Sequence, residues 1–157
     1  KQKTTQNMKP LLITLLALVL GTNVANAQLE QPVTWSYAAK KVSATEAVIY
    51  IKATIDEGWH LYSQNIKPGG PVASQFIFKP AAAYTLIGKV KEPKPIVKNE
   101  KVFNMDVAYF EDSAVFQQKI KLKGKKPFQV KGSVEFMVCN DTQCLPPTEV
   151  VFNIPVK

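Results

Sequence analysis

The sequence predicts an all-β fold, an immunoglobulin-like antiparallel β-sandwich, with a β-barrel as the alternative. The first observation is an alternation with period two, clearest along residues 47–55, where Ala47, Ile49 and Ile51 share one side of the chain. The second is that similar short runs recur, separated by segments rich in Gly, Pro and Asp. The third is that helical periodicity is weak beyond residue 27. Regularly spaced short strands with turn signals are typical of sandwiches and barrels.

Eight or nine strands are expected, each rich in the β-branched and aromatic residues that suit a pleated surface. In chain order they are expected at residues 33–38, 47–55, 59–63, 75–78, 84–90, 108–110, 114–122, 128–138 and 149–154. Turn-forming residues separate them, at 56–58, 67–71, 92–95, 111–113 and 124–127. Residues 91–106 do not alternate and contain two prolines, so we interpret them as a long loop that binds or covers something.

The N-terminal region has the pattern of a secretory signal peptide. A lysine precedes an apolar run over residues 11–20, and the small residues at 25 and 27 suit a cleavage site. The run is too short to cross a bilayer. Residues 1–27 are therefore expected to be upstream sequence plus signal peptide, and residues 28–157 to form one exported domain.

The charge pattern argues against a sequence-specific nucleic-acid-binding protein. The formal net charge is +8 at pH 7, but every basic residue apart from the histidine is a lysine, and the lysines are scattered among acids. The sequence has no arginine, the side chain that best reads phosphate and guanine edges. We therefore interpret the lysines as solvated surface charge and expect no nucleic-acid partner.

Both cysteines lie in the stretch VCNDTQCLPP, residues 138–147. Exported compartments are oxidising, so Cys139 and Cys144 are expected to be joined. Closing so short a loop stabilises a fold by only about 2 kcal/mol, and the strand pattern places the pair at the tip of the last hairpin. This favours a disulfide that takes part in exchange over a structural staple. Pro146 and Pro147 indicate an exposed edge that a partner could approach.

Two other interpretations remain open on these residues. The domain could be a non-catalytic module that docks another exported protein, with a structural disulfide that only shapes the hairpin. It could also be a metal carrier that uses the cysteines with His60 and Met105 or Met137, although this set falls short of a closed four-ligand zinc site. We expect no metal and no cofactor. Hydrolase chemistry has no support, because GxSxG, paired-histidine and glycine-rich phosphate motifs are absent from the sequence.

Three stretches resemble the N-terminal periplasmic domain of DsbD-type thiol:disulfide interchange proteins, also called the disulfide-bond corrector domain. CNDTQCLPPTEV, residues 139–150, resembles the family's cysteine pair followed by Pro-Pro and an acid before the last strand. IDEGWHLYSQNI, residues 55–66, resembles its glycine-aromatic-x-leucine-tyrosine strand. NEKVFNMDVAYF, residues 99–110, resembles its cap loop. Order and spacing agree over essentially all of residues 28–157.

The resemblance implies an immunoglobulin-like, periplasmic protein-disulfide reductase with a link to cytochrome c assembly. It would take electrons from a membrane or thioredoxin-like donor and pass them to exported thiol or disulfide clients. By the same resemblance, Cys144 forms the mixed disulfides and Cys139 resolves them, while Phe103 lies over the disulfide and moves aside for a partner. The protein is expected to be a monomer that works alone or with a separately encoded membrane partner, unless the chain was cut from a longer one.

The resemblance also assigns residues around the pair. Tyr62 matches a tyrosine that lines the family's active site, and His60 stands where the family often has another tyrosine. The sequence departs from the family in two places. The spacing of the cysteines is one residue shorter than in the best-known members, and Lys101-Val102 replaces a pair of carboxylates before the cap aromatic, which leaves only Glu100 nearby.

Overall fold

The computed structural model describes residues 30–157, so the signal peptide expected over residues 1–27 lies outside the described residues. One compact unit covers Gln31–Lys157. Its strands are β1 (Val33–Lys41), β2 (Glu46–Ile55), β3 (His60–Tyr62), β4 (Gln75–Phe78), β5 (Tyr84–Lys91), β6 (Ile96–Glu100), β7 (Met105–Phe110), β8 (Ser113–Leu122), β9 (Phe128–Phe136), β10 (Val138–Cys139) and β11 (Thr148–Val156). No helix of sufficient length and apolarity to cross a membrane occurs within residues 30–157.

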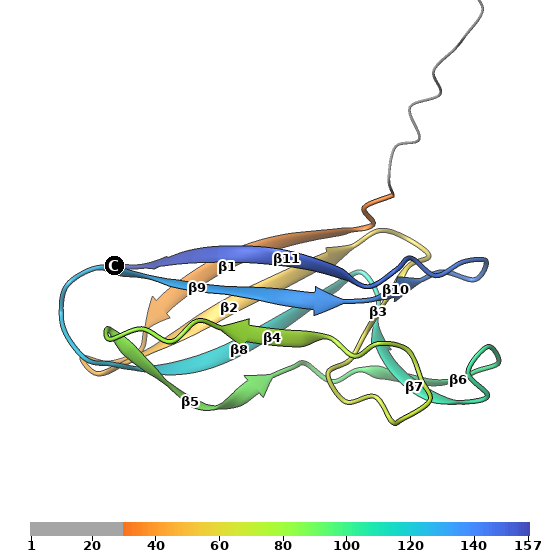
Figure 1. The fold of residues 1–157 in the computed structure, drawn as a ribbon, viewed down its shortest axis with the longest axis horizontal. Coiled ribbons are helices and arrows are strands. Elements are labelled where there is room, and N and C mark those ends of the chain that lie inside the picture. Colours follow the sequence, from red (N-terminus) through yellow and green to blue (C-terminus); the bar gives the residue numbers. More distant parts are fainter. Residues whose placement is uncertain (1–29) are drawn as a thin grey trace, which may run out of the picture. The chain divides into compact units, whose positions relative to one another are not determined.

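The strands form three antiparallel sheets (Figure 1). The first has the order β1-β2-β8-β5 and the second has the order β11-β9-β4, and the main core lies between them. The third has the order β10-β3-β7-β6 and continues from the other two, because β9 runs on into β10 and β7 runs on into β8. The prediction of an all-β, immunoglobulin-like antiparallel sandwich is confirmed.

The main core follows from the alternation in the sequence. Alternate side chains of a strand point to opposite faces, so the apolar set of β2 is buried as one row. That row comprises Ala47, Ile49, Ile51, Ala53 and Ile55. β8 contributes a second buried row that includes Phe116 and Ile120, both 0% exposed. Trp35 of β1 covers this region, with ring centroids 6.2 Å from Phe116 and 5.2 Å from Phe136.

The structure corrects the predicted strands in two places. The interpretation of residues 91–106 as a loop without its own structure is wrong, because β6 pairs with β7 from Ile96 opposite Tyr109 to Glu100 opposite Met105. β6 is an edge strand whose first four residues are exposed, so it needs no apolar alternation that a sequence could reveal. The expected strand 128–138 is also divided, since β9 pairs with β11 whereas β10 pairs with β3.

The turns of the main sandwich gather at two ends, which lie at the right and left of Figure 1. The end that carries the cysteines, here called the disulfide end, comprises the connections 56–59, 111–112 and 140–147. The opposite end, here called the far end, comprises the connections 42–45, 79–83 and 123–127. The candidate active site is therefore confined to one end of the sandwich.

Candidate active site

Strands β3 and β10 place the central side chains of the site by alternation. Leu61 of β3 lies in the main core, whereas Tyr62 belongs to a second, smaller buried cluster and lines a hollow together with His60. In the β10–β3 register, Val138 lies opposite Leu61 and Cys139 opposite His60. Directly opposed residues of an antiparallel pair share a face. Val138 therefore packs in the main core, and Cys139 faces the hollow beside His60.

A tight turn returns the chain from Cys139 to Cys144. The carboxamide oxygen of Asn140 accepts hydrogen bonds from the backbone N–H groups of Thr142 at 2.9 Å and Gln143 at 2.8 Å. The Asn140 N–H in turn donates to the Gln143 carbonyl at 2.8 Å. Asparagine suits such a turn because its short side chain can bond to the backbone two or three residues ahead. The turn brings the two cysteine Cα atoms to 4.0 Å from each other.

Cys139 and Cys144 form a disulfide, and the two residues differ in accessibility. Cys139 is only 4% exposed, because it is paired with β3 and packs in the second cluster. Cys144 is exposed. The more open side of the bridge is therefore that of Cys144, and its buried side is that of Cys139.

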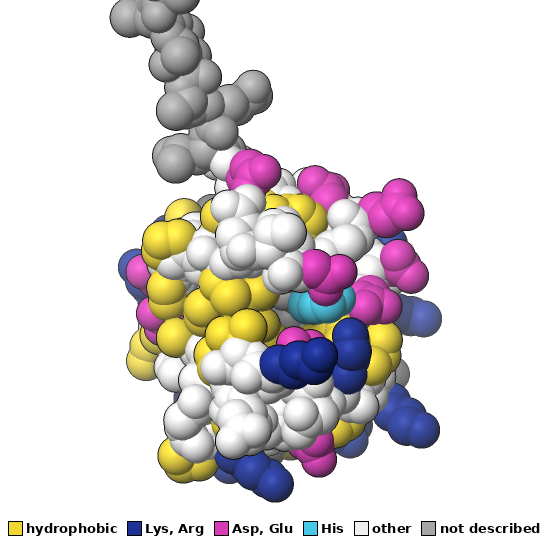
Figure 2. All heavy atoms as spheres, turned by 90° about the vertical axis from the view of Figure 1, so that its right-hand side faces the viewer, with side chains coloured by type: hydrophobic (Ala, Val, Ile, Leu, Met, Phe, Trp, Pro, Cys, Tyr) yellow, Lys and Arg dark blue, Asp and Glu magenta, His cyan; other side chains and the backbone are white. Residues whose placement is uncertain are grey.

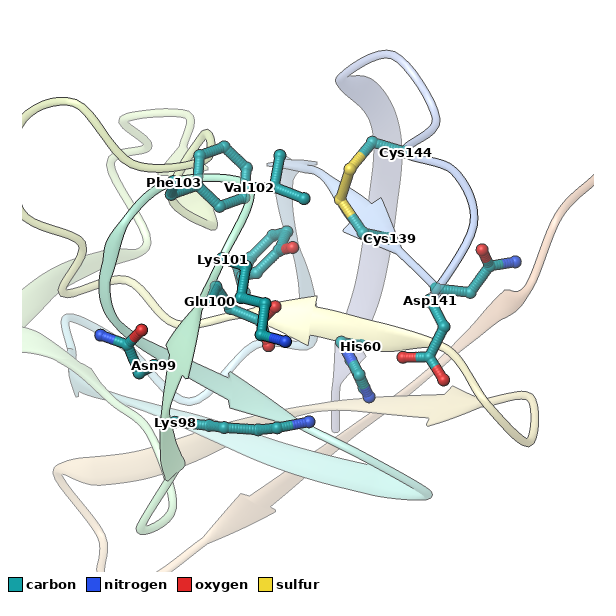
Figure 3. Close-up of a pocket in the computed structure, with 12 residues that line it drawn as sticks. His60, Lys98, Asn99, Glu100, Lys101, Val102, Phe103, Cys139, Asp141 and Cys144 are labelled. Carbon is teal, nitrogen blue, oxygen red and sulfur yellow. A yellow bond between two sulfur atoms is a disulfide. The ribbon is translucent and has the colours of Figure 1, made fainter.

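The cap hairpin, defined as β6, β7 and the turn 101–104, stands opposite the disulfide (Figure 3). The turn is closed by the Phe103 N–H, which donates to the Glu100 carbonyl at 3.1 Å. Asn104 has a φ of 50°, the left-handed conformation that asparagine adopts more readily than most residues. The turn presents Val102 and Phe103 toward the hollow that contains the disulfide.

Phe103 and Val102 differ in how they contribute to the cap. Phe103 is half-buried and packs on the second cluster, with its ring edge-on to Tyr62 at a centroid distance of 6.2 Å. That cluster also contains Cys139. Val102 is 82% exposed at the tip of the turn. An apolar side chain in that position is available for contact with a partner.

The start of the cap hairpin is anchored to the end of β3 through Glu92, which sequence analysis missed. Glu92 Oε1 accepts hydrogen bonds from Ser63 Oγ and from Asn65 Nδ2, both at 2.7 Å, and Oε2 accepts one from the Gln64 N–H at 2.9 Å. Hydrogen bonds to a carboxylate are stronger than those between neutral groups. Glu92 therefore fixes the segment that leads into β6 beside the strand that carries Tyr62.

Burial and nearby carboxylates raise the pKa values of two tyrosines in the site. Glu100 Oε1 is buried and has no hydrogen-bond partner among residues 30–157. Burial, and next the charge of Glu100, raise the pKa of Tyr62 to about 12. The pKa of Tyr109 is also raised, first by burial and then by Glu111, Glu100 and Asp141. Both tyrosines are therefore fully protonated at neutral pH.

His60 is held between two groups that the sequence did not place near it. Its Nε2 lies 3.0 Å from Glu111 Oε1, and its ring lies over that of Tyr109 at a centroid distance of 4.3 Å. Figure 2 shows the histidine on the face of the disulfide end, with acidic side chains on one side of it and lysines on the other. The edge of the site thus carries charges of both signs.

All of the sequence-predicted site residues line one hollow of about 370 Å³. These are His60, Tyr62, Glu100, Phe103, Cys139 and Cys144. Sequence analysis missed Lys98, Asn99 and Asn140, which also line it, and Tyr109 and Glu111, which hold His60. Of these residues, only Tyr109 could have been inferred from the sequence. It is the middle residue of the expected strand 108–110, and alternation along a strand turns such a side chain to one face of the sheet.

No group of three His, Cys, Asp or Glu side chains that could hold a metal ion occurs within residues 30–157. The chemistry that the arrangement supports is exchange at the sulfur–sulfur bond. The bond lines the hollow, with the exposed Cys144 on one side and the buried Cys139, packed with Tyr62 and Phe103, on the other.

The comparisons with known proteins agree with this geometry. The family model described as "Thiol:disulfide interchange protein DsbD, N-terminal" matches residues 26–155. No curated protein sequence matches the chain.

Three similar solved structures establish the fold. The N-terminal periplasmic domain of ScsB from Proteus mirabilis matches with 17% identity and a TM-score of 0.59, over 79% of this chain and 46% of that one. The reduced DsbD N-terminal domain of Neisseria meningitidis matches with 17% identity and a TM-score of 0.53, over 80% and 89%. The complex of the DsbD and PilB N-terminal domains from the same organism matches with 15% identity and a TM-score of 0.52, over 80% and 87%. This chain thus spans less than half of the ScsB chain.

Proposed function

The chain belongs to the family of DsbD N-terminal domains, and we propose that it is an exported protein-disulfide reductase that shuttles electrons between proteins through Cys139 and Cys144. Family membership and the disulfide between the two residues both support thiol–disulfide exchange. A periplasmic location is part of the proposal, because the similar ScsB domain is described as periplasmic. The observation that carries the assignment of roles is the contrast between the buried Cys139 and the exposed Cys144.

The exposed position of Cys144 determines the order of the steps. A thiolate of a reduced dithiol donor attacks Cys144 Sγ, the bond to Cys139 breaks, and Cys139 leaves as a thiolate. The second thiol of the donor, after losing its proton, then attacks the donor sulfur of this mixed disulfide and releases Cys144. The donor becomes a disulfide and the pair becomes a dithiol, so two electrons and two protons have been transferred.

The second half of the cycle runs the same chemistry toward a client. The Cys144 thiolate attacks a client disulfide, and one client sulfur leaves as a thiolate. Cys139, which lies beside Cys144 because the turn 140–143 fixes both, then attacks Cys144 Sγ and releases the client as a dithiol. Cys139 is thus the resolving residue. It does not need to be accessible to a partner, because its target is within the same turn.

The cap hairpin protects the pair between these steps. Phe103 and Tyr62 place apolar rings in the hollow beside the disulfide, which reduces the access of small thiols and oxidants. A protein partner that displaces Phe103 would enter the hollow beside the exposed Cys144 and replace the lost ring contact with its own apolar surface. The proposed partners are thioredoxin-like donors and exported clients. A structurally similar DsbD N-terminal domain occurs in a complex with a PilB domain, which supports docking of another protein domain on this fold.

The test uses residues 28–157, because one compact unit from Gln31 onward contains every described strand and both buried clusters. In Cys139→Ser and Cys144→Ser variants, the remaining thiol is first converted to a mixed disulfide with thionitrobenzoate. Each is then mixed with a reduced thioredoxin that lacks its resolving cysteine, and release of the coloured thiolate is followed.

We expect the Cys139→Ser protein, which retains Cys144, to form the protein–protein disulfide at least about tenfold faster, because exposure controls attack at sulfur. Equal rates, or a faster reaction at Cys139, would contradict the assigned roles. If wild-type protein is not reduced by intact reduced thioredoxin, the proposed function itself is wrong.

A further inference from the structure

The far end of the sandwich carries a group of lysines that nearby acids do not balance. Six exposed lysines lie in its connections or in the strand residues next to them, and are here called the lysine cluster: Lys40, Lys41, Lys79, Lys123, Lys125 and Lys126. Glu46 is the acid closest to them along these strands, and it lies opposite Lys121 in the β2–β8 register, so these two charges offset each other. Within residues 30–157, no acid lies within 4.0 Å of any lysine of the cluster.

An apolar hollow adjoins the cluster. Ala82, Ala83, Pro127 and Phe128 line a space of about 600 Å³, and Lys123, Lys125 and Lys126 line the same space. The ring of Phe128 is held in place by stacking on Tyr84, at a centroid distance of 5.7 Å and an interplanar angle of 18°. Val42, in the neighbouring connection, is 50% exposed. The far end therefore combines positive charge with accessible apolar surface.

The disulfide end has the opposite character. Its connections carry Asp56, Glu57, Glu111, Asp112 and Asp141 and no lysine. Lys98 and Lys101 lie beside them on the cap hairpin. The charge of the molecule is thus separated along the strands, with the cationic end remote from the cysteines.

We infer that the far end docks on the surface of an anionic phospholipid bilayer and leaves the disulfide end facing the aqueous phase. Juxtaposed lysines are attracted to a negatively charged leaflet, their aliphatic stems can lie along apolar surface while the ammonium groups stay in water, and apolar side chains among them can enter the headgroup region. This inference does not depend on the proposed redox function.

The arrangement of the lysines favours an extended anionic surface over a small anion. Lys123, Lys125 and Lys126 line one hollow, but Lys40, Lys41 and Lys79 lie at two other connections, so the cluster as a whole does not converge on one point as tight binding of one phosphate or carboxylate requires. Arginine, whose planar fork gives bidentate recognition of single anions, is absent from the sequence. Charge spread over a broad face strengthens binding to a bilayer, because each lysine contributes independently.

The experiment measures partitioning of residues 28–157, with the disulfide intact, onto sedimentable vesicles. Vesicles of phosphatidylcholine with phosphatidylglycerol are compared with vesicles of phosphatidylcholine alone. We expect binding only to the anionic vesicles, with a strength that falls as salt is raised. Each lysine near such a surface strengthens partitioning roughly fivefold, so the triple variant Lys123→Gln, Lys125→Gln, Lys126→Gln should bind on the order of a hundredfold more weakly.

A matched control removes the same charge elsewhere. Lys89, Lys91 and Lys94 lie along β5 and the segment after it, outside both the lysine cluster and the active-site hollow. Their combined replacement by Gln should leave partitioning within about threefold of wild type, because they do not face the docked surface. Equal loss in the two triple variants would mean that only net charge matters, and would overturn the inference.

Two further results would also overturn it. Sedimentation velocity could show self-association that depends on the same three lysines, without vesicle binding; a second copy of the chain would then be the occupant. Orientation is tested by hydrogen exchange on the vesicles. We expect protection of the amides in 79–83 and 123–126, and unchanged exchange in 140–144. Protection of 140–144 instead would place the disulfide end on the membrane and contradict the inference.

Discussion

The main core and the second cluster share strands β3, β7 and β10 but differ in completeness. The main core is a closed set of aliphatic and aromatic side chains, with Phe116, Ile49 and Ile120 fully buried. The second cluster has only four buried members, and two of them are tyrosines. It lies directly beside an open hollow of about 370 Å³. Buried apolar packing is therefore concentrated between the two large sheets, whereas the disulfide lies in the smaller cluster beside the hollow.

Adjacent residues of one short strand belong to different regions. In β3, Leu61 packs in the main core, and its neighbours His60 and Tyr62 face the hollow. In β10, Val138 and Cys139 are divided in the same way. Because alternation in a strand is strict, a site built on such strands is positioned by the core without being part of it. Changes in the core should thus affect stability, and changes at the hollow should affect exchange.

The largest expected effect on stability is that of Phe116→Ala. Removal of a fully buried phenyl ring from a closed core costs about 4 kcal/mol in the free energy of unfolding, because the cavity left behind cannot collapse. Urea unfolding measures this loss. The rate at which reduced thioredoxin opens the disulfide in the folded fraction should stay within about twofold of wild type. A large change in that rate at unchanged fold would show that the two regions are not separate.

Phe103→Ala is the corresponding change in the cap. Since Phe103 is half-buried, its removal should lower the free energy of unfolding by only about 1 kcal/mol. Reduction by a small thiol such as dithiothreitol should become on the order of tenfold faster, because the ring no longer restricts access to the bridge. Phe128→Ala at the far end is the control, as it removes another half-buried ring without opening the active site. Equal thiol reactivity in wild type and Phe103→Ala would refute the shielding role.

Tyr62→Phe tests the electrostatics of the second cluster. The pKa of Tyr62 is about 12 in the folded chain and about 10 in an unfolded one, so between these values the unfolded state loses a proton that the folded state retains. Stability should therefore fall as pH rises from 10 to 12, by at most about 1.4 kcal/mol per pH unit from this residue. Unfolding measured across this range should show a shallower fall in Tyr62→Phe. An unchanged slope would mean that Tyr62 ionises normally.

The smallest effect is expected for Glu111→Gln. The carboxylate of Glu111 lies 3.0 Å from His60 Nε2, but its side chain is 43% exposed, and contacts of a carboxylate at such exposed positions contribute less than about 1 kcal/mol. Glutamine keeps an acceptor for His60, so the free energy of unfolding should change by less than about 0.5 kcal/mol. A loss of several kcal/mol in thermal or chemical unfolding would show that His60 is a structural centre of the site.

How far the sequence predicts the structure depends on the range of the interactions. Alternation within one strand identified the buried row of β2 and the run of β8, because each depends only on neighbouring residues. Alternation did not reveal β6 and β10 as separate strands. β6 is exposed along most of its length, and β10 has only two residues. In the site, the expected cap and cysteine residues do line one hollow. Contacts made through long-range pairing, such as Glu111 with His60, have no local signal.

The reduction potential of the Cys139–Cys144 pair tests the central claim most directly. The folded protein is equilibrated with thiol–disulfide buffers of known potential, and the fraction of free thiol is measured at each. A shuttle requires a potential above that of thioredoxin, about −270 mV, and below those of oxidised clients, so that electrons can enter and leave. We expect a value in that interval. A value below about −300 mV, typical of structural disulfides, together with resistance of the folded protein to reduced thioredoxin, would contradict the account.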